Sequence, residues 1–253
     1  MNYYFIPISN LNLDQIASSG QCFRWDKVDD NFYVIPYYNT WMSVHQNGNE
    51  LVVETDASKA VVEHYFDLST DYGKIIKETP EDDTYLQAAS KEFSGVRILR
   101  QNLWEVVVSF IISQNNNIPR IKKSVEAICS YTNGIFPQQF EMPSVKLENC
   151  GLGYRQKYVE NLNGKDYIPP VNSDYRDALE FYQRFIGIGP KVANCICLYG
   201  LHYLEACPID TWMKRIIDER YNGTIPVWMY SKYAGVYQQY CFCYERYLNG
   251  RDK

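Results

Sequence analysis

Phe185-Ile-Gly-Ile-Gly-Pro-Lys-Val-Ala-Asn-Cys195 is the stretch that decides how the second half of the chain folds. Gly187 and Gly189 lie two residues apart, which is typical of a tight turn where backbone approaches something closely. Apolar residues then recur at helical spacing over 192–199, so Lys191 lies at the start of a helix. The segment predicts two helices joined by a hairpin, over about residues 178–201.

Such a hairpin can bind a phosphate, because N–H groups at a glycine turn and at a helix start are free to donate. We therefore expect the backbone of Gly187, Gly189 and Val192 to form a phosphate site. Asp210 follows Lys191 by nineteen residues. An amine beside a phosphate site, with a carboxylate on a neighbouring element, suggests nucleophilic chemistry on nucleic acid.

Both residues also have simpler interpretations. Lys191 could contact phosphate only, as many hairpin lysines do. Asp210 precedes a helical pattern over 211–217, where an aspartate commonly caps the helix N-terminus. The two interpretations of Asp210 are compatible, because a capping carboxylate is fixed in place.

The net charge of the chain says little about whether it binds nucleic acid. Its 253 residues carry a formal net charge of −5, with 46% hydrophobic and 15% aromatic residues. An acidic total argues weakly against nucleic acid, but distribution matters more than the sum. Basic residues gather between 96 and 123, and we expect them to form a basic face: Arg97, Arg100, Arg120, Lys122 and Lys123.

The cysteines predict neither a metal site nor disulfides. None of the eight falls in a CxxC pair, and the four closely spaced cysteines of an iron–sulfur cluster are missing. Scattered thiols suit a reducing compartment. With no targeting pattern at the N-terminus and no apolar run of spanning length, we expect a soluble cytoplasmic protein that binds no membrane.

The fold class expected is α+β. Short aromatic and β-branched runs separated by turn signals predict an antiparallel meander of four strands, at 22–25, 32–35, 41–44 and 51–54. From Ser58 the spacing becomes helical. We expect an N-terminal antiparallel sheet lobe with a flanking helix over 1–95, followed by an all-helical body over 96–253 that contains the hairpin.

Several further segments carry a family resemblance: Gly20-Gln-Cys-Phe-Arg-Trp25, Val96-Arg-Ile-Leu-Arg-Gln101, Ser109-Phe-Ile-Ile-Ser-Gln-Asn-Asn-Asn-Ile-Pro-Arg120 and Gly151-Leu-Gly-Tyr-Arg155. With the hairpin, Lys191 and Asp210, the chain resembles the helix-hairpin-helix DNA glycosylases, and within them 8-oxoguanine DNA glycosylase. The resemblance runs in order from about Gly20 to Phe242.

The resemblance implies a base excision repair enzyme that acts on double-stranded DNA as a monomer. Lys191 would attack C1′ of the deoxyribose, displace the oxidised base and form a Schiff base that permits strand cleavage by β-elimination. Asp210 would stabilise positive charge on the sugar. The resemblance implies no resident cofactor, although a cation could assist the hairpin when DNA is bound.

The resemblance also implies a pocket for the extruded base. The carbonyl of Gly20 would accept the N7–H that distinguishes 8-oxoguanine from guanine. Gln238 and Phe242, four residues apart on one predicted helix, would contact the Watson–Crick edge and stack on the base. Cys195 would face the other side of the base. Without the resemblance, Phe242 and Cys195 are ordinary core residues.

A second group of residues would hold the DNA after extrusion. Tyr154 resembles the wedge that fills the gap, while Asn115, Arg120 and Arg155 resemble residues that contact the opposite cytosine. Such donors and acceptors fit cytosine better than adenine, so we expect a preference for 8-oxoguanine paired with cytosine. The alternative for the asparagine run at 115–117 is a helix cap.

One position departs from the family: Trp212 stands where eukaryotic members have histidine, which puts that phosphate contact in doubt. A compact chain without a long basic tail favours a bacterial-type, nucleoid-associated enzyme. The alternatives are an adenine or pyrimidine-lesion glycosylase, an alkylated-base glycosylase, a catalytically silent damage-binding module and a helix-hairpin-helix scaffold. The missing iron–sulfur cysteines and the Gln238/Phe242 pair weigh against the first, and Lys191 weighs against the second. Lys191 together with Asp210 weighs against the silent module, and the base-pocket residues weigh against the scaffold.

Overall fold

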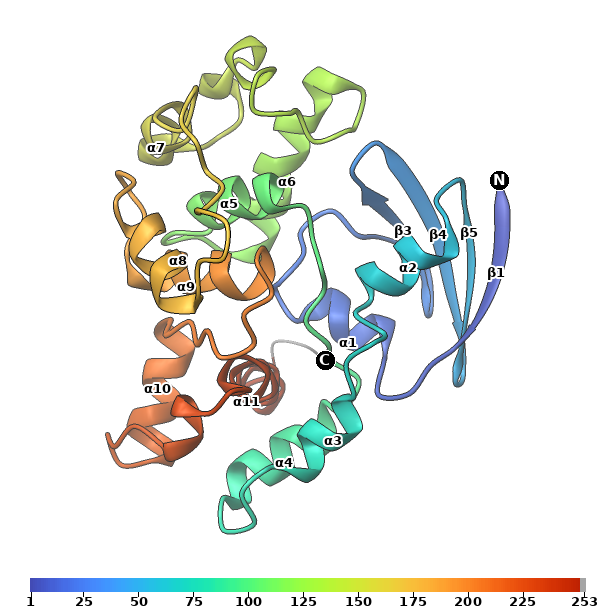
Figure 1. Cartoon of the computed structure of the whole chain (residues 1–253), viewed down its shortest axis with the longest axis vertical. Helices are drawn as coiled ribbons and strands as arrows, with labels where there is room; N and C mark the ends of the chain where they lie inside the picture. Colours follow the sequence, from blue (N-terminus) through green and yellow to red (C-terminus); the bar gives the residue numbers. More distant parts are fainter. Residues whose placement is uncertain (251–253) are drawn as a thin grey trace.

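The computed structural model describes residues 1–250 as a sheet lobe beside a larger helical body (Figure 1). The sheet has five antiparallel strands in the order β1-β5-β4-β3-β2. Their bounds are β1 Asn2–Pro7, β2 Asp26–Asp29, β3 Phe32–Tyr37, β4 Thr40–Asn47 and β5 Glu50–Thr55. The predicted antiparallel sheet is confirmed, and β1 is a strand that the sequence patterns did not identify.

Alternation of side chains makes β3, β4 and β5 half-buried strands. Val44 and Val53 are directly paired and fully buried, whereas their neighbours along each strand face outward. The turns between strands use residues with positive φ: Asn31 at 55°, Tyr38 at 53° and Gly48 at 57°. The turns separate the strands as expected, and the three strands at 32–35, 41–44 and 51–54 are confirmed.

The fourth expected strand, at 22–25, is wrong. Residues 21–25 are buried but belong to no strand, and β2 begins only at Asp26. The segment is held instead by the side chain of Gln21, which donates to the carbonyl of Arg97 (2.8 Å) and accepts from the N–H of Leu99 (2.9 Å). An apolar run buried between two lobes therefore resembled a strand in sequence without pairing as one.

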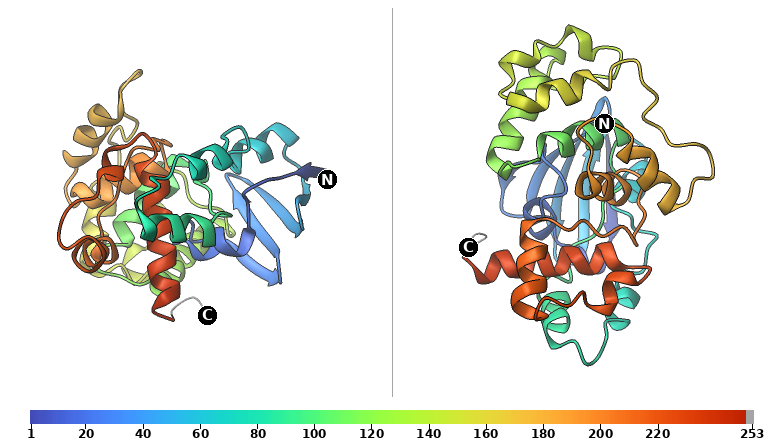
Figure 2. Two further views of the ribbon diagram at one scale, coloured as in Figure 1. Left: turned by 90° about the horizontal axis from the view of Figure 1, so that it is seen from below. Right: turned by 90° about the vertical axis from the view of Figure 1, so that its left-hand side faces the viewer.

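Eleven α-helices account for the described helical segments of more than four residues. They are α1 Leu13–Ser18, α2 Lys59–Tyr65, α3 Tyr72–Lys77, α4 Thr84–Glu92, α5 Leu103–Ile112, α6 Ile118–Cys129, α7 Gln156–Glu160, α8 Tyr175–Gln183, α9 Pro190–Tyr199, α10 Thr211–Arg220 and α11 Ala234–Leu248. Helices α8 and α9 pack together and form the predicted helix-hairpin-helix. Figure 2 shows α11 crossing the body beside α10 and α4.

Two separate cores stabilise the molecule. The first lies between the sheet and helices α1 and α2, and includes Ile16, Val44 and Phe66. The second fills the helical body around α5, whose residues 106–112 are all buried. Helices α3 and α4 contribute to this second core. The lobe boundary that we expect at residue 95 stays a prediction.

Residues 96–102, which join α4 to α5, connect the two lobes through polar contacts. Arg97 is 3% exposed and donates to the carbonyls of Ser9, Asp67 and Thr70. Arg100 pairs with Asp67 (Nε to Oδ1, 2.8 Å), and His202 lies 3.1 Å from the other Asp67 oxygen. The expected basic face is therefore wrong at Arg97, which is buried. Arg100 is partly exposed, but its charge is paired with the buried Asp67.

Within residues 1–250, no helix combines the length and apolar character needed to cross a membrane.

Candidate active site

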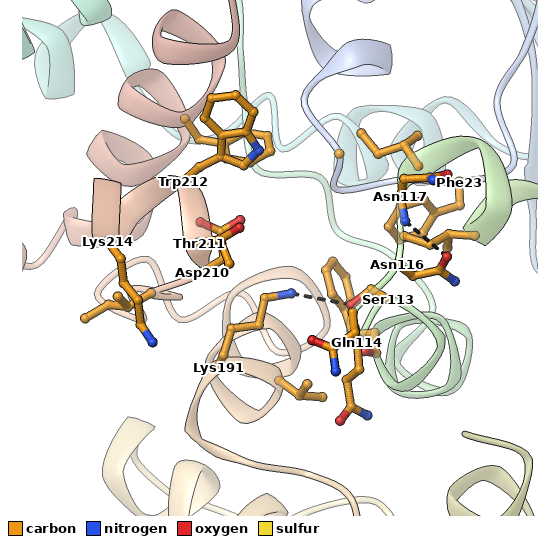
Figure 3. Close-up of a pocket in the computed structure, with 18 of the residues that line it drawn as sticks. Phe23, Ser113, Gln114, Asn116, Asn117, Lys191, Asp210, Thr211, Trp212 and Lys214 are labelled. Carbon is orange, nitrogen blue, oxygen red and sulfur yellow. Dashed lines mark hydrogen bonds between the residues drawn. The ribbon is translucent and has the colours of Figure 1, made fainter. Parts of the chain in front are cut away.

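A pocket of about 860 Å³ opens between the hairpin, the start of α10, α11 and the loop after α5 (Figure 3). Its walls come from segments far apart in the sequence. The lining residues are Gly20, Phe23, Phe110, Ser113, Gln114, Asn115, Asn116, Asn117, Ile118, Pro119, Ile121, Gly189, Pro190, Lys191, Val192, Ile209, Asp210, Thr211, Trp212, Lys214, Phe242 and Arg246. The pocket thus brings together the hairpin lysine, the distant aspartate and part of the expected base site.

Lys191 lies in the first turn of α9 and extends into the pocket. Gly189 is the N-cap in extended conformation and Pro190 opens the helix, an arrangement that suits proline's missing N–H. The Lys191 amine donates to Ser113 Oγ (3.4 Å) and lies 5.5 Å from the centre of the Phe110 ring. Among residues 1–250, no carboxylate lies within 4.0 Å of this amine. The amine therefore forms no ion pair with the described residues.

Asp210 caps α10 from a neighbouring wall of the pocket (Figure 3). One carboxylate oxygen accepts the N–H of Met213 at 2.9 Å, which confirms the capping interpretation. The capping bond fixes the carboxylate beside the space in front of Lys191, so its negative charge can act there by its field. Capping and an electrostatic role are compatible in this geometry.

The hairpin uses its two glycines differently. Gly187 has φ +87°, and a Cβ added there would lie 2.3 Å from the ring of Tyr158. Gly189 has φ −89°, and a Cβ there would meet nothing within 4 Å. The first N–H groups of a helix have no partner inside it, and α9 has no side-chain cap. The N–H groups at the start of α9, including that of Val192, therefore have no partner inside the helix. The phosphate site that we expect here stays a prediction.

The expected base-binding residues fall into two groups. Gly20 (φ +76°) and Phe242 both line the pocket, and a Cβ on Gly20 would lie 3.6 Å from the Phe242 ring. Gln238 and Cys195 are 3% and 2% exposed and do not line the pocket. Burial raises the pKa of Cys195 to about 11, partly opposed by Lys191, so its thiol is neutral at pH 7.

The opposite-base residues also differ from one another. Asn115 lines the pocket, is exposed and has φ +45°, and its side chain donates to Tyr154 Oη at 3.2 Å. Tyr154 is 45% exposed, and Arg120 is exposed at the start of α6. Arg155, in contrast, is 5% exposed and its guanidinium contacts backbone carbonyls. The contact of Arg155 with an opposite cytosine, which the resemblance implies, stays a prediction.

Several lining residues were not identified from sequence as site residues. Ser113 lies inside a segment that carried the resemblance, but its contact with Lys191 spans 78 positions and no local pattern indicates it. Arg246 follows Phe242 by one helical turn, a spacing that could have identified it; its guanidinium lies 5.3 Å from the Phe242 ring. Trp212 and Lys214 also line the pocket. Asn117 caps α6, as the alternative for the asparagine run predicts.

The described residues show no candidate metal centre: within 1–250, no three His, Cys, Asp or Glu side chains group as ion ligands. All eight cysteines are free thiols, and seven of them are buried. The expectation of no resident cofactor stays a prediction.

Known proteins resemble this chain over most of its length. The family described as 8-oxoguanine DNA glycosylase, N-terminal domain, matches residues 3–107. An N-glycosylase/DNA lyase of Saccharomyces cerevisiae is 29% identical over 88% of this chain and 72% of its own length.

Two solved structures share the whole architecture. The protein MBOgg1, in complex with a low-affinity DNA ligand, is 31% identical with a TM-score of 0.87, covering 98% of this chain and 100% of its own. The Clostridium acetobutylicum 8-oxoguanine glycosylase/lyase, bound to double-stranded DNA with cytosine opposite 8-oxoguanine, is 31% identical with a TM-score of 0.84, covering 95% and 93%. The chain therefore belongs to the 8-oxoguanine DNA glycosylase family of N-glycosylase/DNA lyases.

Proposed function

We propose that this protein removes 8-oxoguanine from double-stranded DNA and then cleaves the strand at the resulting site. The observation that carries the proposal is the Lys191 amine, which projects into the pocket and forms no ion pair, while Asp210 is fixed on a neighbouring wall. The Clostridium relative is named an 8-oxoguanine glycosylase/lyase, which supports the same substrate here.

The chemistry follows from the nature of the two groups. The unprotonated Lys191 amine attacks C1′ of the deoxyribose, and the bond between C1′ and the base breaks with its electrons leaving on the base. Positive charge that develops on the sugar is stabilised by the Asp210 carboxylate. Ring opening gives a Schiff base between Lys191 and C1′. Loss of a C2′ proton then expels the 3′ phosphate by β-elimination, and water releases the aldehyde from the amine.

The pocket also offers a means of recognising the lesion. The carbonyl of Gly20 would accept the N7–H of the oxidised base, and Phe242 beside it would stack on the base. Gln238 lies one turn earlier on α11 and would contact the Watson–Crick edge after a shift toward the pocket. Cys195 lies behind Lys191 on α9, and its neutral thiol would pack near the base.

The opposite strand would be held outside the pocket. We propose that Tyr154, exposed beside Asn115, enters the gap left by the extruded base. Asn115, Arg120 and Arg155 would contact a cytosine there. The hairpin N–H groups would bind a phosphate of the damaged strand, with a cation if one is present. The protein would act as a monomer, without a resident cofactor.

The direct test is single-turnover incubation with an 8-oxoguanine:C duplex, with and without borohydride. The expected result is strand cleavage, and a covalent protein–DNA adduct when borohydride reduces the Schiff base. Undamaged G:C duplex is the control and should give neither. An adduct with another lesion but not with 8-oxoguanine would contradict the substrate. No adduct with any lesion would contradict the lyase chemistry and leave Lys191 as a phosphate contact.

A further inference from the structure

Arg246, on α11 one helical turn after Phe242, contacts two parts of the pocket at once. Its guanidinium carbon lies 5.3 Å from the centre of the Phe242 ring, and its Nη1 donates to the carbonyl of Ser18 at 3.1 Å. Ser18 is the last residue of α1 and lies two positions before Gly20. Arg246, Phe242 and Gly20 all line the pocket. One side chain thus contacts both the ring and the segment that would recognise the base.

The bond between Arg246 and Ser18 also joins the two lobes. Helix α1 packs in the core of the sheet lobe through Leu13 and Ile16, whereas α11 packs in the core of the helical body through Tyr240. The last carbonyls of a helix have no partner inside it, and a charged donor forms a stronger bond with such an oxygen than a neutral donor does. The joint that Arg246 makes between the lobes therefore lies at the edge of the base pocket.

The backbone of Gly20 lies directly against the Phe242 ring. Gly20 has φ +76°, and a Cβ added there would lie 3.6 Å from that ring. On the other side of Gly20, the Gln21 side chain binds the backbone of the connection 96–102 at 2.8 and 2.9 Å. Gln21 thus fixes this segment to the connection between the lobes, and Arg246 fixes it to α11.

Recognition of the lesion by a carbonyl requires accurate placement. A carbonyl distinguishes an N–H donor from an acceptor only within hydrogen-bond reach, about 2.7–3.2 Å between the heavy atoms. The carbonyl of Gly20 belongs to the segment that follows α1, whereas the Phe242 ring belongs to α11. A small movement between these two elements would change the position of the carbonyl relative to a base stacked on the ring. The bond from Arg246 to Ser18 opposes that movement.

We infer that Arg246 is a positioning residue for lesion recognition, which holds the segment of Gly20 against Phe242 and so sets the slot for the extruded base. The inference rests on the proposed function, which gives the carbonyl of Gly20 and the ring of Phe242 their roles. Arg246 acts through these two residues, so it affects release of the base. It does not affect chemistry at C1′ once the base has gone.

The test compares single-turnover rates at saturating protein on two duplexes, one with 8-oxoguanine and one with a preformed abasic site, each opposite cytosine. The abasic duplex reports strand cleavage with no damaged base to recognise. Arg246→Met keeps an unbranched side chain beside Phe242 but removes the donor to Ser18. Release of 8-oxoguanine should slow roughly 10-fold, because a hydrogen bond from a charged donor is lost. Cleavage at the abasic site should not change.

Arg215→Met is the matched control. Arg215 is an exposed arginine of α10 whose guanidinium lies 6.0 Å from the centre of the Trp212 ring, and it pairs with Glu219 on the same helix. This variant also removes a guanidinium beside an aromatic ring, but it breaks no bond to α1, so the ratio of the two rates should stay at the wild-type value.

Two results would overturn the inference. Equal loss on both duplexes in Arg246→Met would show a general loss of active protein or of DNA binding. If Arg246 contacted a DNA phosphate instead, affinity for both duplexes would fall alike and the salt dependence of binding would weaken. A wild-type rate on both duplexes would also overturn the inference, because the bond to Ser18 would then have no part in recognition.

A measurement on the free protein tests the same inference without DNA. Amide hydrogen exchange over residues 18–22 should be faster in Arg246→Met than in wild type or Arg215→Met, and unchanged exchange there would overturn the inference. If Arg246→Met does not fold, Arg246→Lys keeps the charge and one donating group, and should show both changes more weakly. If the wild type does not release 8-oxoguanine, the proposed function fails, and the exchange result still decides whether Arg246 holds the segment of Gly20.

Discussion

Two walls of the pocket are built in different ways. We call the two walls by their proposed roles. The catalytic wall consists of residues 187–191 and Asp210, at the starts of α9 and α10. Its geometry comes from N-caps and a glycine turn, each set within a few residues of sequence. The opposite-base wall consists of residues 114–115 and 153–155, and contacts across about 40 positions of sequence hold it. The backbone of the first wall is therefore set by local signals, although the Lys191 side chain also contacts the distant Ser113. The second wall depends on distant partners throughout.

This difference explains how far sequence could predict the site. Local signals predicted that Lys191 starts a helix, that Asp210 caps the next one and that the hairpin lies between α8 and α9. The same kind of signal could not show that Arg155 is buried against Gln114, or that Ser113 contacts Lys191. Those contacts depend on how distant segments fold together.

The fold also separates into elements that neighbouring residues define and contacts that distant residues make. Alternation and turn residues predicted β3, β4 and β5, because each of these strands and turns is defined by neighbouring residues. The strand predicted at 22–25 was wrong because this stretch is anchored through the neighbouring Gln21 side chain, which bonds the backbone of Arg97 and Leu99, and does not pair with a strand. The prediction that Arg97 lies on a basic face was wrong because its carbonyl partners lie 27 to 88 positions away in the sequence.

The largest expected effect is on Lys191. If the catalytic wall acts through this one amine, Lys191→Gln should lower single-turnover base release by at least about 1,000-fold, since the nucleophile is lost. Binding to an 8-oxoguanine:C duplex, measured by fluorescence anisotropy, should change little. A loss of affinity that accounts for the whole loss of rate would contradict the nucleophilic role.

Asp210→Asn separates charge from capping within the same wall. Asparagine is as good an N-cap as aspartate, so the stability of α10 should be kept. The negative charge is lost, and base release should slow by roughly 100- to 1,000-fold. Asp210→Ala is the comparison variant, because it should lose the charge and also about 1 kcal/mol of stability. Equal rates in wild type and Asp210→Asn would leave Asp210 as a cap only.

Asp67→Asn tests whether the buried charge cluster beyond the C-terminal end of α9 affects the rate of base release in the pocket. Asp67 is buried against Arg100 and His202, which follows α9. Asparagine tolerates the positive φ of this position (50°), but loss of the charge should cost about 3 kcal/mol in the free energy of unfolding. Because the catalytic wall is set locally, the single-turnover rate of the folded variant should stay near wild type. A variant that is as stable as wild type but reacts more slowly would contradict the claim that the catalytic wall is set locally.

The stability that Asp67 contributes to the wild type should depend on pH. Burial raises the pKa of Asp67, but His202, Thr70 and Arg100 together lower it below its ordinary value of 3.8. A lowered folded-state pKa contributes stability that is present above the unfolded pKa and lost as the pH falls through the folded value. The difference in unfolding free energy between wild type and Asp67→Asn, followed by urea denaturation, should therefore shrink as the pH falls below 3.8. A difference that grows in acid would contradict this.

The two hairpin glycines allow a matched comparison. Gly187→Ala adds a Cβ against Tyr158 at a positive φ, and should cost about 1–3 kcal/mol of stability. Gly189→Ala meets no atom within 4 Å and should cost at most about 1 kcal/mol, from the poorer N-cap. Thermal unfolding of both variants measures this. Because Tyr158 touches Tyr154, Gly187→Ala should also speed amide exchange at residues 153–155, whereas Gly189→Ala should not.

The smallest expected effect is on Lys214, the second lysine of the pocket lining. It is exposed on α10, so Lys214→Gln should remove about one phosphate contact. Affinity for DNA should fall less than about 10-fold, and the slope of log affinity against log salt should decrease by about one. The single-turnover rate at saturating protein should not change, which distinguishes Lys214 from Lys191.

Mapping of the borohydride-trapped adduct tests the central claim most directly, because two lysines line the pocket. After trapping on an 8-oxoguanine:C duplex, the protein is digested and the peptide that carries the deoxyribose remnant is sequenced by mass spectrometry. We predict that the modification lies on Lys191. Modification of Lys214 or of the N-terminal amine, with Lys191 unmodified, would contradict the assignment of Lys191 as the nucleophile.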